Sequence, residues 1–360
     1  MRKSNIELYR IIVMLLIVAH HYVVNSGLME AIENTTITTT SCAMLLFGAW
    51  GKIGINCFVF ITGWFMCQSH FSWQKFIKLY AQITVYAVGI YIVFSLFGYE
   101  KFKPVTMLLK FFPVRDITDV FTSCFLVFYL TIPFLNVLLQ NLTQKQHLYL
   151  TILLLTIYSL LPSIFNMPIS FNYVEWFIVL YILAAYMRKY GDKYVQNCPS
   201  IWGWLTLTSA IIASIAVVVP PFLYKYGILH HYLGYSTVSD SNKILALFVA
   251  VTSFMWFKDL RIPNSKFINT IAGATFGVLL IHANSDAMRN WLWRKTIDCV
   301  GHFSDNFIPT VGYAAVMVLA VFSVCAAIDL LRGRLMDNYV STLYFRIKAR
   351  NHQPIESQEQ

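Results

Sequence analysis

The first apolar segment of the chain, residues 6–25, carries an arginine and a histidine whose spacing could place them in one reaction site. Arg10 and His21 lie eleven residues apart, which at about 100° per residue is three helical turns plus roughly 20°. Both side chains would therefore leave one face of a helix, about 16 Å apart along its axis, whereas His20 points about 80° away from Arg10. A histidine near neutral pH can take a proton from a hydroxyl group or accept a transferred group itself, and an arginine suits a phosphate.

A packing role is the alternative for each of these two residues. Arg10 could extend its side chain to the inner headgroups, and His21 could bond to a neighbouring helix. However, ionisable groups at membrane depth are costly and mark functional sites by default. Two of them on one face favour a cleft, with Arg10 nearer the cytoplasm and His21 nearer the outside.

A second set of polar residues is expected at the same depth as His21. His282 lies near the outer end of the ninth apolar segment and is followed by Asp286, while Asn172 and Glu175 open the sixth segment. Taken alone, His282 fits a hydrogen-bonded packing residue better than a catalyst. We treat His282 and Glu175 as candidates for a supporting site around His21.

Two further patterns are less specific. Gly51 and Gly54 have the spacing that lets membrane helices pack closely. Lys75 and Lys78 lie three residues apart at the inner start of a helix. Ordinary anchoring by cytoplasmic basic residues explains the two lysines, and a phosphate contact is the functional alternative.

The composition shows which elements must position these residues. Of 360 residues, 58% are hydrophobic and 12% are charged, about half the charge of a soluble domain, and the mean hydropathy is +0.60. The excess of basic residues, 27 against 17 acidic, needs no nucleic acid partner, because membrane proteins concentrate Lys and Arg in cytoplasmic loops. The seven cysteines show no metal-ligand spacing, so no metal is expected.

The predicted fold is all-α, a polytopic transmembrane helical bundle of about ten spans. A span needs about 20 mostly apolar residues, and the first is too interrupted by Arg10 and His20 to be a cleaved signal peptide. Residues 1–331 form one membrane domain, and residues 332–360 form a basic and polar tail. The expected spans are 6–25, 41–67, 76–98, 120–140, 147–165, 173–190, 201–224, 243–258, 267–284 and 308–331.

The basic residues also predict the orientation. With the N-terminus inside, sixteen of the 27 Lys and Arg residues fall in cytoplasmic segments and eight in outer loops. This bias and the even number of spans place both termini in the cytoplasm.

The segments above resemble the acyltransferase-3 family of membrane O-acyltransferases. Residues 5–22 resemble the family's first span, in which an arginine is followed, after ten intervening residues, by a histidine, as Arg10 and His21 are here. Residues 51–63 resemble its second span, and the segments 125–136 and 276–282 are also similar. Lys75 and Lys78 stand where the family usually has two arginines, a change that keeps the charge but loses the bidentate fork.

The resemblance implies a multi-pass protein of the cell membrane that takes an acyl group, commonly acetyl, from cytoplasmic acyl-CoA. The acceptor would be a hydroxyl of a cell-surface or lipid-linked glycan. His21 and Arg10 would be catalytic, Lys75 and Lys78 would bind acyl-CoA, and no other cofactor is implied.

A transporter or flippase for a glycan or lipid-linked sugar is the alternative, because buried Arg and His also occur in substrate pathways. No half-to-half repeat typical of transporters is evident. The sequence also lacks a GxSxG nucleophile elbow, an HExxH motif and a phosphate loop. It does not identify the acceptor, the acyl length or the oligomeric state.

Overall fold

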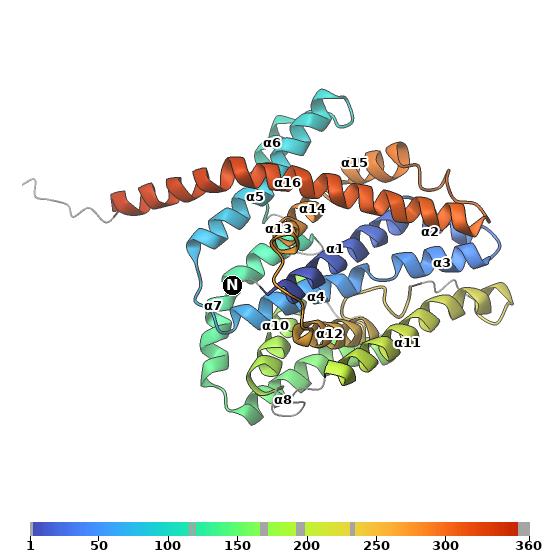
Figure 1. The fold of residues 1–360 in the computed structure, drawn as a ribbon, viewed down its shortest axis with the longest axis horizontal. Coiled ribbons are helices and arrows are strands. Elements are labelled where there is room, and N and C mark those ends of the chain that lie inside the picture. The colour runs from blue at the N-terminus through green and yellow to red at the C-terminus, as the bar shows by residue number, and fades with distance from the viewer. Residues whose placement is uncertain are drawn as a thin grey trace, which may run out of the picture.

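The computed structural model describes residues 3–114, 117, 120–165, 172–191, 199–230 and 235–351, with the backbone alone at 199, 337–341 and 343–351. Every regular element in these ranges is a helix (Figure 1). Helix α1 begins and α16 ends on the same side of the bundle, at the left of Figure 1. The all-helical prediction is therefore confirmed.

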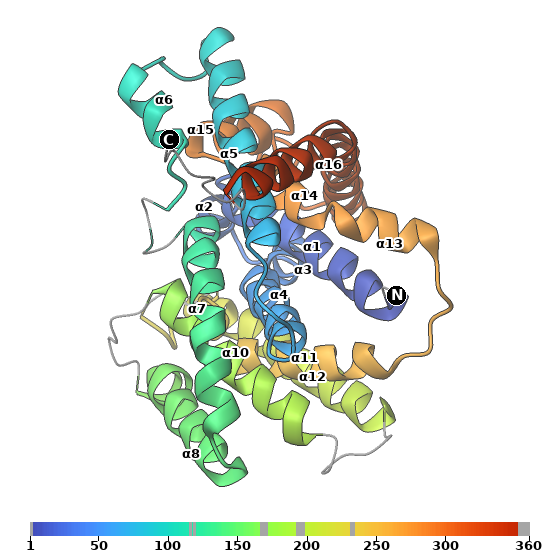
Figure 2. The same cartoon turned by 90° about the vertical axis from the view of Figure 1, so that its left-hand side faces the viewer.

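Helix α1 (Ser4–Val24) crosses the middle of the view in Figure 1, and in Figure 2 its N-terminal end lies on the right-hand side of the bundle. More than half of its residues are buried, including polar Ser4, Asn5 and Glu7. A helix so enclosed by protein can carry polar groups that a lipid-facing helix could not. Its partners are α3 (Thr39–Gly48), α4 (Gly51–Met66), α12 (Ile244–Asp259), α13 (Lys266–Gly273), α14 (Thr275–His282) and α16 (Phe307–Asn351).

A second group of helices packs on α4 from the other side. Helix α10 (Tyr173–Tyr190) contacts α4, α7 (Phe121–Asn141) and α8 (Gln144–Leu155). The Trp176 indole, fully buried, donates a 2.8 Å hydrogen bond to Asn56 of α4 and joins the two groups. Helix α8 continues through the π-helical turn η1 (Thr156–Leu160) into α9 (Leu161–Ile164).

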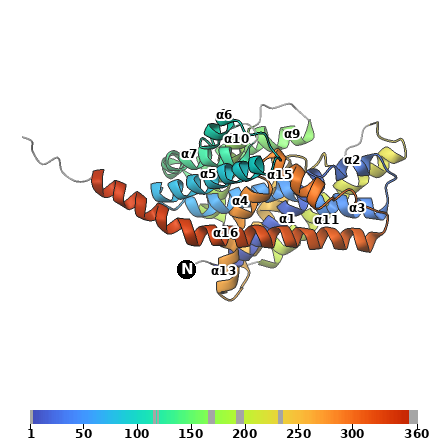
Figure 3. The ribbon, with the colours of Figure 1, turned by 90° about the horizontal axis from the view of Figure 1, so that it is seen from above.

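The remaining helices lie at the periphery. They are α2 (Leu28–Glu33), α5 (Trp73–Leu96), α6 (Pro104–Lys110), α11 (Pro199–Lys225), α15 (Asp286–Arg289) and the π-helical η3 (Asn290–Thr296). Seen from above, α16 runs along one edge of the bundle as a single long helix (Figure 3). It continues to Asn351, so residues 332–351 extend the last span as helix, and residues 352–360 of the predicted tail lie outside the described residues.

Seven helices of the described ranges are long and apolar enough to cross a membrane, or eight if one bent pair is counted as a span. Helices nevertheless occupy all ten predicted segments. Helix α10 carries Glu175, Arg188 and Lys189 near its ends, and α12, with 16 residues, is only about 24 Å long against a hydrocarbon core of about 30 Å. The predicted span 267–284 coincides with α13–α14 and ends at a break, where the chain bends by 95° into α15–η3.

A buried aspartate ties three helices together beside that break. Asp329 of α16, 2% exposed, accepts hydrogen bonds from Tyr86 (2.8 Å) and Gln82 (3.0 Å) of α5 and from Arg332 (2.8 Å). Gly277 of α14 packs directly on this carboxylate, and a Cβ there would overlap its Cγ. The missing side chain thus lets α14 approach α16.

We therefore expect Gly277→Ala to lower the stability of the protein. Asp329 is held by three donors and cannot move aside, so the overlap should cost about 1–3 kcal/mol, the usual range for overpacking. Thermal unfolding in nanodiscs, followed by circular dichroism, measures the change. Gly89→Ala on α5 is the matched control, because a Cβ there meets nothing within 4 Å. Equal melting temperatures for the two variants would contradict this packing.

Candidate active site

Two histidines far apart in the sequence meet at the ends of α1 and α14. His21 Nδ1 lies 2.9 Å from His282 Nε2, and the ring centroids are 5.0 Å apart. His282 Nδ1 lies 2.6 Å from the carbonyl oxygen of Val278, one turn earlier on α14. His282 is fully buried and His21 is half-buried, so His21 is the member of the pair that a substrate can reach.

These contacts assign the tautomers of both rings in their neutral form. A carbonyl oxygen can only accept, so His282 Nδ1 carries the proton and donates to Val278. His282 Nε2 then has the lone pair and accepts from His21 Nδ1–H. The lone pair of His21 is left on Nε2, for which the described part of the chain provides no hydrogen-bond partner. This arrangement suits a general base or a nucleophile.

The break between α14 and α15 positions His282. Ser285 caps α15 by accepting from the backbone N–H of Met288, so the chain turns within three residues of His282. Trp293 of η3, fully buried, then folds back, and its ring centroid lies 6.2 Å from that of His282 and 6.0 Å from that of Tyr22 of α1, both in edge-to-face contact. Irregular backbone of this kind is tolerated in membranes where protein covers it or a cavity is lined.

The neighbouring His20 has a different environment. Its Nδ1 bonds to the backbone carbonyl of Gly48, and its ring packs on Gly51 so closely that a Cβ would overlap it. His20 therefore packs α1 against α3 and α4, and the glycine spacing predicted for close packing accommodates its ring.

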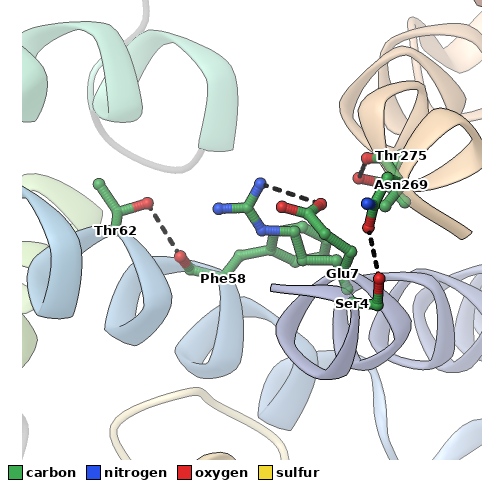
Figure 4. Close-up of polar contacts among 8 residues, drawn as sticks. Ser4, Glu7, Phe58, Thr62, Asn269 and Thr275 are labelled. Carbon is green, nitrogen blue, oxygen red and sulfur yellow. Dashed lines mark hydrogen bonds and ion pairs between the residues drawn. The ribbon is translucent and has the colours of Figure 1, made fainter. Parts of the chain in front are cut away.

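Arg10 lies in the first half of the same helix. It is half-buried and forms an ion pair with Glu7 (3.7 Å), which the dashed line at Glu7 marks in Figure 4. Glu7 lies between Phe58 and Thr62 of α4 on one side and Asn269 of α13 on the other (Figure 4). Because α1 is continuous from Ser4 to Val24, Arg10 stays three turns from His21, and the two residues cannot act on one atom.

The other predicted residues lie elsewhere. Lys75 is exposed and Lys78 half-buried in the first turns of α5, whose N-cap is Ser72. Glu175 accepts from Asn172 (2.8 Å) and Tyr158 (3.2 Å), contacts that connect α10 with η1 rather than with α1. Of the two residues expected near His21, His282 contacts it, whereas Glu175 contacts Tyr158 instead.

Two cations near His21 were not selected from the sequence. Lys52 of α4 and Arg289 of α15 both lie close enough to interact electrostatically with the His21 ring. Lys52 could have been singled out by its charge beside a span, but Arg289 occupies an ordinary-looking loop position and gives no such signal.

The site lies inside a known domain family. The family model described as an acyltransferase domain matches residues 3–330, nearly the whole chain. The chain belongs to the acyltransferase-3 family. The match includes both members of the His21–His282 pair as well as Arg10. Comparison with curated proteins and with solved structures returns no match.

Membership in the acyltransferase-3 family and the long apolar helices together indicate a multi-pass membrane acyltransferase. The resemblance to the acyltransferase-3 family is confirmed, and the match covers residues 3–330.

We expect His282→Ala to lower kcat about 10- to 100-fold, the range typical when the outer partner of a functional histidine is removed. Loss of the acceptor would free His21 to adopt the other tautomer. His282→Gln should retain more activity, because its amide oxygen can accept from His21 Nδ1–H. Acyl transfer and melting temperature would be measured together.

His147→Ala is the matched control for His282→Ala. His147 is also fully buried and also bonds a backbone carbonyl, that of Ile182 (3.0 Å), but it packs between α8 and α10. Equal losses of activity in the two alanine variants would show that His282 contributes only packing.

Proposed function

We propose that this acyltransferase-3 protein transfers an acyl group, acetyl in the simplest case, from cytoplasmic acyl-CoA to a hydroxyl of a cell-surface or lipid-linked glycan. The observation that carries the proposal is the hydrogen-bonded series from Val278 through His282 to His21, inside an acyltransferase domain. An alcohol is a poor nucleophile at neutral pH, and this series presents an imidazole lone pair to it.

In the proposed reaction, His21 Nε2 takes the proton of the acceptor hydroxyl as its oxygen attacks the thioester carbonyl. The carbon–sulfur bond breaks, and the CoA thiolate leaves and receives the proton from His21. His282 accepts from His21 Nδ1–H throughout and holds the ring orientation. The same Nε2 lone pair also supports a two-step route, in which the acyl group is first carried on His21.

The donor is proposed to enter from the side where Arg10 lies. Basic residues favour both termini in the cytoplasm, and α1 begins and α16 ends on one side of the bundle (Figure 1). The phosphates of acyl-CoA would bind Arg10 through charge-assisted hydrogen bonds. Lys75 and Lys78 would contact the donor as it enters. The extended pantetheine arm would then bring the thioester along α1 to His21.

The central test replaces His21 with alanine. His21→Ala should abolish transfer, a loss of at least about 10²-fold, while the protein stays folded. Purified protein in nanodiscs would receive radiolabelled acetyl-CoA and the cell's own surface glycans. His20→Ala is the control, since it should lower stability through lost packing but retain transfer.

Retained transfer in His21→Ala would overturn the catalytic assignment. No label on any acceptor from any acyl-CoA, with folded wild-type protein, would instead favour the transporter alternative, in which His21 and Arg10 belong to a substrate pathway.

Arg10→Gln should raise the KM for acyl-CoA about tenfold or more, because a hydrogen bond between charged groups is worth about 1.5–3 kcal/mol. Lys75→Gln and Lys78→Gln should raise it less, since exposed point charges are screened by salt. Initial rates at varied acyl-CoA measure the effect, with Lys225→Gln at the far end of α11 as control. A loss confined to kcat would place Arg10 in the chemical step rather than in donor binding.

A further inference from the structure

Two cations from separate elements, Lys52 of α4 and Arg289 of α15, lie near the end of α1 that carries His21. Lys52 follows Gly51, the residue on which the His20 ring packs, so it lies beside the last turn of α1. Arg289 lies one turn before Trp293, whose ring contacts those of His282 and Tyr22. Both charges interact electrostatically with His21. The reactive end of α1 is therefore lined with positive charge.

Among the described residues, the hydrogen-bond partner of Lys52 is a neutral one. Its Nζ donates to the hydroxyl of Tyr173 (2.9 Å) and lies 5.6 Å from the centre of that ring. No carboxylate of the described residues lies within ion-pair distance of Lys52. A half-buried ammonium at membrane depth without a counter-ion is costly to maintain. Its charge is available to an anionic ligand.

Arg289 is also available despite its ion pair. Among the described residues its ion-pair partner is Asp286, which lies three residues earlier in the same short helix and whose side chain is 97% exposed. Ion pairs of such exposed groups contribute little, about 0–1 kcal/mol. An incoming anion could therefore share the guanidinium at small cost.

The charge of the whole segment is unusual for its side of the membrane. Asp286–Thr296 holds three basic residues, Arg289, Arg294 and Lys295, and one acidic residue. In the proposed orientation this segment faces outward, where membrane proteins avoid Lys and Arg. Arg294 also turns toward α1, because a Cβ at Gly27 would lie 3.7 Å from its Cζ. An external anionic partner explains this concentration.

The donor does not supply that anion in the proposed reaction. Its phosphates belong near Arg10, three turns of α1 away, and only the uncharged thioester needs to reach His21. The remaining reactant at His21 is the acceptor. The positive charge of Lys52 and Arg289 therefore favours an acceptor that carries a negative charge.

We propose that Lys52 and Arg289 bind an anionic group of the acceptor, a phosphate or a carboxylate, and thereby hold a neighbouring hydroxyl at His21 Nε2. The inference rests on the proposed function and narrows its acceptor to anionic glycans. Arginine matches the paired oxygens of either group, and lysine adds a point charge.

Binding of three probes to protein in nanodiscs tests the proposal without requiring turnover. The probes are glucose, glucose 1-phosphate and glucuronate, and quenching of tryptophan fluorescence reports binding next to Trp291 and Trp293. Wild type should bind a charged sugar at least about tenfold more tightly than glucose, as one charge-assisted hydrogen bond predicts. The better of the two charged probes identifies phosphate or carboxylate.

Lys52→Gln and Arg289→Gln should each remove most of this preference, and Lys52→Arg should retain it. Lys225→Gln, which changes a distant cation, should leave it intact. His21→Ala should still bind the charged sugars more tightly than glucose but should no longer transfer the acyl group. Failure of the proposed reaction would therefore appear in the transfer assay, and failure of the anion site would appear in the binding assay. Melting temperatures confirm that each variant is folded.

Two results would overturn the anion site. One is wild-type protein that binds neither charged sugar better than glucose, or glutamine variants that keep the preference. The other result is kinetic and uses the glycan that the wild-type protein labels as acceptor. It is a fall in the kcat of Lys52→Gln and Arg289→Gln while their KM for this acceptor stays unchanged. That pattern would mean that the two cations stabilise charge in the transition state instead.

Discussion

The hydrogen bond between His21 and His282 is the constraint on which the rest of the site depends. It joins residues 261 positions apart, and it defines a reactive lone pair only because His282 is itself fixed by the carbonyl of Val278. Complete burial of His282 keeps water from competing for these contacts. For the bond to form, the last turn of α1 and the last turn of α14 must meet within the bundle.

The surrounding helices satisfy that requirement by different means. α1 is enclosed on several sides, which fixes its rotation, and the carboxylate of Asp329 draws α5, α14 and α16 together where Gly277 leaves room. The break after His282 then returns the chain so that Trp293 covers the buried ring. A straight helix continuing after His282 would carry Trp293 away from the His282 ring and leave that ring without this cover.

The sequence predicts the local part of this arrangement and little of the rest. Helical periodicity is enough to place Arg10 and His21 on one face, and apolar length is enough to locate ten helices. Hydropathy does not separate helices covered by lipid from helices covered by protein, so the sequence does not show how much of α10 or α12 faces lipid. The positions of His282 and Glu175 looked equivalent, but only contacts between distant segments place one on His21 and the other on Tyr158.

Charge is distributed along α1 in a way that suits two anionic reactants. Arg10 lies in the first half of α1 and pairs with Glu7, whereas Lys52 of α4 and Arg289 of α15 lie near its last turn, and the apolar middle turns of α1 separate the two groups. Two anions bound at one place would repel each other strongly in a low-dielectric interior. In the proposed reaction the two anions would bind about three turns of α1 apart, which weakens that repulsion and leaves only the uncharged thioester and hydroxyl to meet at His21. The proposed separation places Arg10 of α1 at one end and the two cations of α4 and α15, beside His21, at the other.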